Sequence, residues 1–303
     1  MSTIRRILCP LDFSRFSEHA FEHAVAIAYE FSAEVEALHV SAVAPVAATV
    51  GIGSPIVLEP ARLLDSERGA LEAQLRDLTF DVETSGVSLR TAVREGDPVA
   101  MVIARAMEWP ADLIVMGTHG RSGFDRLILG SVAEKVLRRA PCPVLIVPPR
   151  VGMSTPPLGL SRILCCVDFS PASLRALDEA TALAAAEGPG VTVLHAVELL
   201  ADGSGMRDEL LFGTEHIRED LRRAALERLT DAIPAALRAR CRITEKVTSG
   251  KAWKEILRVA AEEETDLIVL GVTGRMTADL MLFGSTTQHV VRQSPCPVLT
   301  IRA

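Results

Sequence analysis

Short apolar runs alternate with longer segments of helical periodicity along the whole chain. In the first half, the apolar runs that predict strands lie near 5–10, 34–41, 87–93, 112–117 and 143–147. The segments that predict helices lie near 16–32, 61–80, 97–109 and 131–140. Runs without polar alternation, such as 113–116, are typical of central strands covered on both faces. The pattern therefore predicts an α/β fold with a five-stranded parallel sheet and helices on both faces.

The second half of the chain repeats the first. The sequence ILCPLDFS at 7–14 recurs as ILCCVDFS at 163–170, a displacement of 156 positions. Further along, DLIVMG at 112–117 recurs as DLIVLG at 266–271, displaced by 154. An internal repeat of this length predicts two tandem copies of one domain.

We place the first domain at 1–150 and the second at 159–303. The segment 148–157 between them is rich in Pro and Gly, as is typical of a linker. The total length of 303 residues fits two domains of ordinary size.

Composition narrows the class of protein. An apolar fraction of 49% with 23% charged residues excludes a disordered chain, a collagen-like repeat and a disulfide scaffold. A net charge of −7, with scattered basic residues and few aromatics, argues against binding to nucleic acid. The six cysteines form no C-x-x-C pair, which favours reduced, buried thiols over bridges or zinc.

No segment predicts export or membrane insertion. The apolar run after Met1 is too short for a signal peptide. The weakly polar stretch 43–58 is broken by Gly and Pro, so it predicts a loop rather than a membrane-spanning helix. We therefore expect a cytoplasmic protein.

A glycine pattern, G-x2-G-x9-G-S, follows the fourth predicted strand of each copy. Its members are Gly117, Gly120, Gly130 and Ser131 in the first copy, and Gly271, Gly274, Gly284 and Ser285 in the second. Glycines let main-chain N–H groups approach phosphate oxygens, and the helix that follows adds the positive end of its dipole. The alternative is that each serine only caps its helix, because Ser131-x-x-Glu134 and Ser285-x-x-Gln288 are capping boxes. A cap needs neither Gly117 nor Gly120, which favours phosphate binding.

Asp12 and Asp168 end the first strands, where ligands of open parallel sheets bind. Each carboxylate would suit a base amino group or a ribose hydroxyl, or it would cap the following helix. Both interpretations stay open. Arg121 and Arg275 either approach the phosphates or are solvated loop charges.

With these motifs the chain resembles the universal stress protein family, in its tandem-domain form and its ATP-binding branch. The residues that carry the resemblance in the first copy are Asp12, Val40, Gly117, Gly120, Gly130, Ser131 and Val132. The resemblance implies two Rossmann-like domains, of the adenine nucleotide alpha hydrolase-like kind, with strand order 3-2-1-4-5. It further implies that Asp and Val meet the adenosine of ATP and that the loop with His119 meets the phosphates. We expect Mg²⁺ with the ATP, because a bound triphosphate usually carries it.

The second copy departs from this pattern. Ala196 replaces Val40, Thr286 replaces Val132 and Lys251-Ala252 replace Asp97-Pro98. We therefore expect the second site to bind ATP more weakly or to bind a different nucleotide.

The fifth predicted strands, 144–147 and 298–301, are apolar and would be exposed at sheet edges unless paired. The resemblance implies that such strands pair across a two-fold axis, so we expect an intrachain pseudo-dimer. A homodimer of tandem chains is the alternative.

We expect a nucleotide-dependent sensor or regulator of the stress response rather than an enzyme of rapid turnover. The chain lacks G-x4-G-K-[ST] and the H-R-D and D-F-G sequences of kinases. Slow ATP hydrolysis or autophosphorylation is one alternative, because Ser122, His119 and Ser131 would lie near the phosphates.

Two further alternatives concern other parts of the chain. His19 and His23 have a spacing that can bind zinc, but no third ligand is evident, and His39 and His195 are expected to be satisfied core histidines. The stretch 43–58 is either a lid or partner surface, which would suit a scaffold or a binder of apolar ligands, or a disordered loop.

Overall fold

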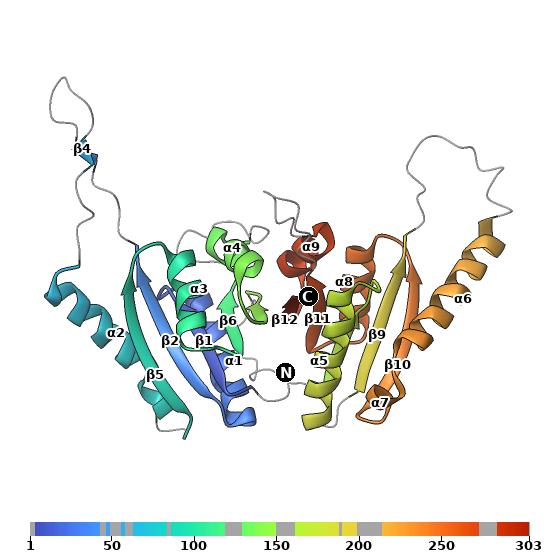
Figure 1. The fold of residues 1–303 in the computed structure, drawn as a ribbon, viewed down its shortest axis with the longest axis horizontal. Coiled ribbons are helices and arrows are strands. Elements are labelled where there is room, and N and C mark those ends of the chain that lie inside the picture. The colour runs from blue at the N-terminus through green and yellow to red at the C-terminus, as the bar shows by residue number, and fades with distance from the viewer. Residues whose placement is uncertain are drawn as a thin grey trace. The chain divides into compact units, whose positions relative to one another are not determined.

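The computed structural model describes residues 4–42, 47–48, 56–57, 63–83, 86–118, 129–149, 161–187, 190–198, 214–272 and 284–302. Contacts between residues divide the chain into two compact units, and the division falls within a strand, between Val144 and Leu145. Figure 1 shows the first repeat in blue to green and the second in yellow to red.

The first repeat alternates strands and helices along the chain. Its strands are β1 (Arg6–Leu11), β2 (Glu34–Ser41), β5 (Ser88–Glu95), β6 (Leu113–Gly117) and β7 (Val144–Val147). Its helices are α1 (Arg15–Phe31), α2 (Asp65–Glu83), α3 (Pro98–Glu108) and α4 (Ser131–Arg139). The strands lie in the order β5-β2-β1-β6-β7, and parallel pairing places Leu8 of β1 beside Glu36 of β2.

The second repeat has the same organisation. Its strands are β8 (Arg162–Cys166), β9 (Gly190–Val197), β10 (Arg242–Ser249), β11 (Leu267–Val272) and β12 (Val298–Arg302). Its helices are α5 (Pro171–Glu187), α6 (Thr214–Ala232), α7 (Ala235–Arg238), α8 (Ala252–Glu262) and α9 (Ser285–Gln293). The strand order is β10-β9-β8-β11-β12. The short helix α7 is an addition that the periodicity of the sequence did not predict.

These observations confirm the predicted α/β fold of two Rossmann-like halves with strand order 3-2-1-4-5. With this strand order and the right-handed crossovers that parallel strands nearly always have, the first two helices of a half cover one face and the last two cover the other. Strands β1 and β6 are neighbours, but the next strand after β1 lies on one side of this pair and the next strand after β6 lies on the other, so the direction of winding reverses between them. The same reversal occurs between β8 and β11. The carboxyl ends of these strands are therefore the expected ligand positions.

Some expectations about segments need adjustment. Helix α2 begins at Asp65 rather than near 61, since the described residues Leu63 and Leu64 precede it without helical structure. Within 43–58, which we expected to be a loop, residues Ala47–Ala48 (β3) and Ile56–Val57 (β4) pair as a short antiparallel ribbon. Among the described residues, no helix is both long and apolar enough to cross a membrane. The expected pairing of the fifth strands concerns how the two units sit together and stays a prediction.

The cysteines of the chain are all free thiols. Cys9, Cys165, Cys166 and Cys296 are buried, as predicted. Cys142 and Cys241 are only partly buried because they lie in the turns before β7 and β10 rather than in strands. Burial raises the pKa of the Cys142 thiol to about 12, so little of this thiol is the reactive thiolate at neutral pH.

A buried ion pair joins strand β2 to helix α3 in the first repeat. The Glu36 carboxylate, on the sheet and only 1% exposed, accepts bonds of 2.6 Å from both Nε and Nη2 of Arg105. A bidentate pair of this kind satisfies both oxygens and fixes the helix over the strand. Glu36 lies among the buried apolar residues Val35, Ala37 and Leu38 of β2, so its burial depends on Arg105.

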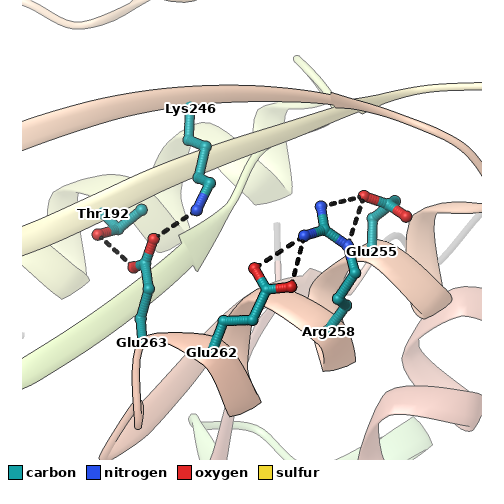
Figure 2. A network of polar contacts seen from close by, with 6 residues as sticks. All are labelled: Thr192, Lys246, Glu255, Arg258, Glu262 and Glu263. Carbon is teal, nitrogen blue, oxygen red and sulfur yellow. Dashed lines mark hydrogen bonds and ion pairs between the residues drawn. The ribbon is translucent and has the colours of Figure 1, made fainter.

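The second repeat distributes its charges differently. Thr192 and Val259 stand where the first repeat has Glu36 and Arg105. The carboxylate now comes from Glu263, just after α8, and accepts from Thr192 Oγ1 at 3.0 Å and from Lys246 Nζ at 2.7 Å (Figure 2). Farther out on α8, Arg258 lies between Glu255 and Glu262 in the same view. The two repeats thus join helix to sheet by different polar contacts.

The second repeat therefore supplies a matched replacement for the buried ion pair. Arg105→Val alone leaves the Glu36 carboxylate buried without its cation, and we expect it to lower the free energy of unfolding by about 3 to 5 kcal/mol. The double variant Glu36→Thr/Arg105→Val takes the second repeat's residues at these two positions and leaves no buried charge unpaired, so it should recover most of this loss. Urea denaturation of the three proteins measures both effects, and a double variant no more stable than the single one would contradict this account.

Candidate functional site

A tight corner follows strand β1 and leads into helix α1. Asp12 Oδ1 accepts from the Ser14 hydroxyl at 2.6 Å and from the Ser14 N–H at 3.1 Å. Ser14, not Asp12, is the N-cap of α1, because its Oγ accepts the Ser17 N–H. The suggestion that Asp12 caps the helix is therefore wrong: the residue two positions later has the extended backbone and the short hydroxyl side chain that a cap requires.

A cavity of about 310 Å³ opens beside this corner, at the carboxyl ends of β1 and β6. It is lined by every first-copy residue that we predicted from the sequence and that the structure describes. These are Asp12, Val40, Gly117, Gly130, Ser131 and Val132. The other predicted residues of this copy, His119, Gly120 and Arg121, lie outside the described residues.

Further walls of the cavity come from residues that the sequence did not single out. They are Pro10, Leu11, Ser17, Leu38, Pro98, Val102, Met116, Thr118 and Ala133. Most are apolar, so the cavity has hydrophobic walls with the Asp12 carboxylate at one side and the start of α4 at another. The sequence carried a weak signal for Pro98 only, as part of the pair Asp97-Pro98 that the second copy lacks.

Helix α4 starts at the cavity with a glycine as its N-cap. Gly130 has no side chain to cap the helix, and its N–H donates to the Thr118 carbonyl at 2.7 Å. The capping box at Ser131 is therefore wrong, since Ser131 is the first helical residue and Glu134 binds Arg138 instead. The predicted box at Ser285 is wrong for the same reason, because Gly284 takes the N-cap of α9. Uncapped N–H groups leave the positive end of the helix dipole available to an anion.

Gly117 has a packing role that the sequence did not reveal. A Cβ atom at this position would lie 2.8 Å from the main-chain oxygen of Phe16 in helix α1. At Gly271 in the second repeat, a Cβ atom would lie 2.3 Å from the main-chain nitrogen of Ser173 in helix α5. Both glycines are thus required by the approach of a helix to the sheet, so their presence alone does not argue for a phosphate.

Gly284 contrasts with these two glycines. Its φ of −55° is open to any residue, and a Cβ atom would meet only Thr287 Oγ1, at 3.9 Å. Neither backbone conformation nor described neighbours within the chain require a glycine at this N-cap. A glycine at this N-cap leaves room for the close approach of a ligand.

The second repeat places its predicted residues on equivalent elements. Asp168 follows β8, Ala196 lies on β9 and Gly271 on β11, while Ser285 and Thr286 begin α9. Asp168 Oδ1 accepts the Ser170 N–H at 2.9 Å. Burial acts to raise the pKa of Asp168, but hydrogen bonds from Ser170 and Ser173 outweigh it and lower the pKa below its usual value. Gly274 and Arg275 lie outside the described residues.

A stacked aromatic pair lies near the start of α8 and α9. The rings of Trp253 and His289 are 4.7 Å apart and nearly parallel, and His289 Nδ1 lies 2.7 Å from the Ser285 carbonyl oxygen. The first repeat has Val99 and Lys135 at these positions, so this contact belongs to the second repeat.

The histidines take the roles that the sequence suggested. His39 is buried and His195 is partly buried, and each bonds through Nδ1 to a main-chain carbonyl, of Leu11 and Val167 respectively. The rings of His19 and His23 lie 4.8 Å apart on α1. Across the described part of the chain, no group of three His, Cys, Asp or Glu side chains is placed to hold a metal ion.

Fold and cavity together define a tandem α/β protein with a small-molecule cavity at the switch point of its first sheet. Residues 3–148 and 159–302 each match the universal stress protein family, and the chain belongs to that family. One repeat is 41% identical over 143 residues to the universal stress protein MJ0531 of Methanocaldococcus jannaschii, covering 47% of this chain and 81% of the relative. The protein YxiE of Bacillus subtilis is 34% identical over 146 residues, covering 47% of this chain and 97% of that protein.

A solved structure resembles the whole chain. A universal stress protein from Archaeoglobus fulgidus aligns with a TM-score of 0.69 at 24% identity, covering 98% of both chains. At this level of identity the likeness concerns the fold alone.

The packing of Gly117 and Gly271 predicts that substitutions at these two glycines lower stability more than a substitution at Gly284. We expect Gly117→Ala to lower the free energy of unfolding by about 1 to 3 kcal/mol, and Gly271→Ala by at least as much, because the added Cβ would overlap helix backbone. Gly284→Ser is the control, and it should cost nothing because Ser is a favoured N-cap and its Cβ has room. Chemical denaturation measures all three, and equal stability of the Gly117 variant and the wild type would refute the packing role.

Proposed function

We propose that this universal stress protein binds ATP in the cavity of its first repeat and uses nucleotide occupancy as a sensor in the stress response. The observation that carries the proposal is the convergence of Asp12, Val40, Gly130 and Ser131 on one cavity from three separate parts of the chain. The cavity volume of about 310 Å³ lies at the lower end of the range for small-molecule sites, which suits a nucleoside with its phosphates outside.

The adenosine end of the nucleotide is assigned to the apolar walls. The apolar side chains that line the cavity include Leu38, Val40, Val102 and Met116. A purine that packs against them removes apolar surface from water, which favours binding. Asp12 is the acceptor for a ribose hydroxyl or a base amino group. A carboxylate would repel the phosphates, so they are assigned to the other side.

The phosphates are assigned to the start of α4. The N-cap there is Gly130, which has no side chain of its own to cap the helix, so main-chain N–H groups and the helix dipole can act on an anion together. Ser131, exposed at the first helical position, adds a hydroxyl donor. Mg²⁺ would be held by the triphosphate itself, because phosphate oxygens are its preferred ligands.

The second repeat is assigned a weaker site or one for a different nucleotide. It keeps Asp168 and an uncapped α9 with a glycine N-cap. Ala196 and Ala252 replace the larger Val40 and Pro98, which removes apolar contact with a base.

A sensor fits these residues better than an enzyme of rapid turnover. The first-repeat cavity contains Asp12 as its single ionisable side chain among the described lining residues, and that carboxylate is assigned to the adenosine end. Slow hydrolysis or autophosphorylation remains the second candidate, since the Ser131 hydroxyl would lie beside the phosphates. A turnover number below about 1 per second would support the sensor, and one in the usual enzyme range would support the alternative.

The experiment compares nucleotide bound to the wild type and to two matched variants of the whole chain. Ser131→Glu places a negative charge at the start of α4, where it suits the helix dipole but repels phosphate. Ser285→Glu does the same in the second repeat. We expect denatured wild type to release ATP, Ser131→Glu to lose the nucleotide of the first repeat, and both variants to unfold no more easily than the wild type.

Several outcomes would contradict the proposal. A wild type that releases no nucleotide and binds none from added ATP and Mg²⁺ rules it out, and favours a scaffold or a binder of apolar ligands. Wild-type ATP binding in Ser131→Glu would show that the phosphates do not lie at α4. Both substitutions are at exposed helix starts, so we expect the stability of the chain to be unchanged. A loss of binding in a variant of unchanged stability is then not caused by unfolding.

A further inference from the structure

Each repeat contains the same strained residue after its first strand. Phe13 has a φ of 61° and Phe169 a φ of 63°, in the left-handed region that bulky side chains rarely adopt. Such a conformation costs free energy and persists only where its surroundings hold it. Its presence at equivalent places in two diverged repeats indicates that the corner is maintained for a reason beyond local preference.

A histidine from the neighbouring strand holds this corner. The His39 ring lies 4.4 Å from the Phe13 ring, and His39 Nδ1 lies 2.7 Å from the Leu11 carbonyl oxygen. A carbonyl only accepts, so Nδ1 carries the proton and donates it. In the second repeat the His195 ring lies 4.5 Å from the Phe169 ring, and its Nδ1 lies 2.8 Å from the Val167 carbonyl oxygen.

Asp12 lies between the two residues that His39 contacts. The hydrogen bond fixes the Leu11 carbonyl on one side of it, and the ring contact fixes Phe13 on the other. With both neighbours held, the Asp12 carboxylate is directed so that Oδ1 accepts from Ser14, and Leu11 and Asp12 together line the cavity. His39 itself is not among the residues that line the cavity, so it acts on the site through its neighbours.

We propose that His39 and His195 are positioning residues that hold the left-handed Phe corner and thereby orient the carboxylates of Asp12 and Asp168 toward the nucleotide. This inference rests on the proposed function, in which Asp12 binds the adenosine end of ATP. It adds that the orientation of the carboxylate is set by a hydrogen bond from the adjacent strand.

Two substitutions separate the hydrogen bond from the packing of the ring. His39→Asn keeps an N–H donor at the place of Nδ1 but removes the ring. His39→Phe keeps an aromatic ring against Phe13 but removes the donor to Leu11. A residue that merely fills the core would tolerate Phe better than Asn, because His39 is buried.

The binding experiment measures the affinities of the whole chain for ATP and for inorganic tripolyphosphate by calorimetry. We expect His39→Phe to weaken ATP binding at the first repeat about tenfold while leaving tripolyphosphate affinity unchanged, because only the adenosine end depends on Asp12. His39→Asn should retain most of the ATP affinity. In an Asp12→Ala background, His39→Phe should have no further effect, since the two residues act as one unit. His195→Phe is the matched control and should leave the first site unchanged.

Wild-type ATP affinity in His39→Phe, or an equal loss in the Asp12→Ala background, would overturn the inference. A crystal structure of ligand-free His39→Phe gives a second readout that needs no nucleotide. Departure of Phe13 from positive φ, with loss of the bond from Ser14 to Asp12, supports the inference, and an unchanged corner overturns it. If the wild type binds no ATP, the proposed function fails, while this structure still decides whether His39 orients Asp12.

Discussion

The approach of the first helix to the fourth strand leaves no space for a side chain at Gly117, and the site depends on that contact. Because Phe16 packs against Gly117, the start of α1 lies close to the carboxyl end of β6. The corner in which Ser14 donates to Asp12 therefore lies near the same strand end. The cavity then lies between this corner and the start of α4. Gly271 and Ser173 make an even closer contact in the second repeat, so the same constraint acts twice in one chain.

The two repeats share the corner after the first strand, whereas the polar contacts between a helix and the sheet differ between them. Both repeats keep the Asp, the left-handed Phe and the histidine bonded to the strand carbonyl. The polar contacts at α3 and at its counterpart α8 are different, with Glu36 and Arg105 in one repeat and Lys246 and Glu263 in the other. Two different charge arrangements attach the helix to the sheet in this chain. A single arrangement of residues holds the carboxylate at the end of the first strand in both repeats.

Much of the fold could be predicted from the sequence because hydrophobic periodicity and the internal repeat are both properties of the chain itself. The glycine motif likewise led to the strand end beside which the cavity lies. It was harder to predict which of several neighbouring residues is the N-cap of a helix. Ser14 rather than Asp12 is the N-cap of α1, and Gly130 rather than Ser131 is the N-cap of α4. The N-cap position depends on backbone geometry, which the motif does not encode. The apolar walls of the cavity, such as Leu38 and Met116, carry no signal that separates them from the core. The packing role of Gly117 was hidden because it depends on a helix that is distant in sequence.

The two tryptophans of the chain fall one in each repeat and in opposite environments. Trp109 is buried just after α3, while Trp253 is partly exposed and stacked on His289 beside the start of α9. The intrinsic fluorescence of this protein therefore has two components with separate origins. Trp253 lies in a contact between α8 and α9, so the emission spectrum reports on each half of the molecule separately without any added dye.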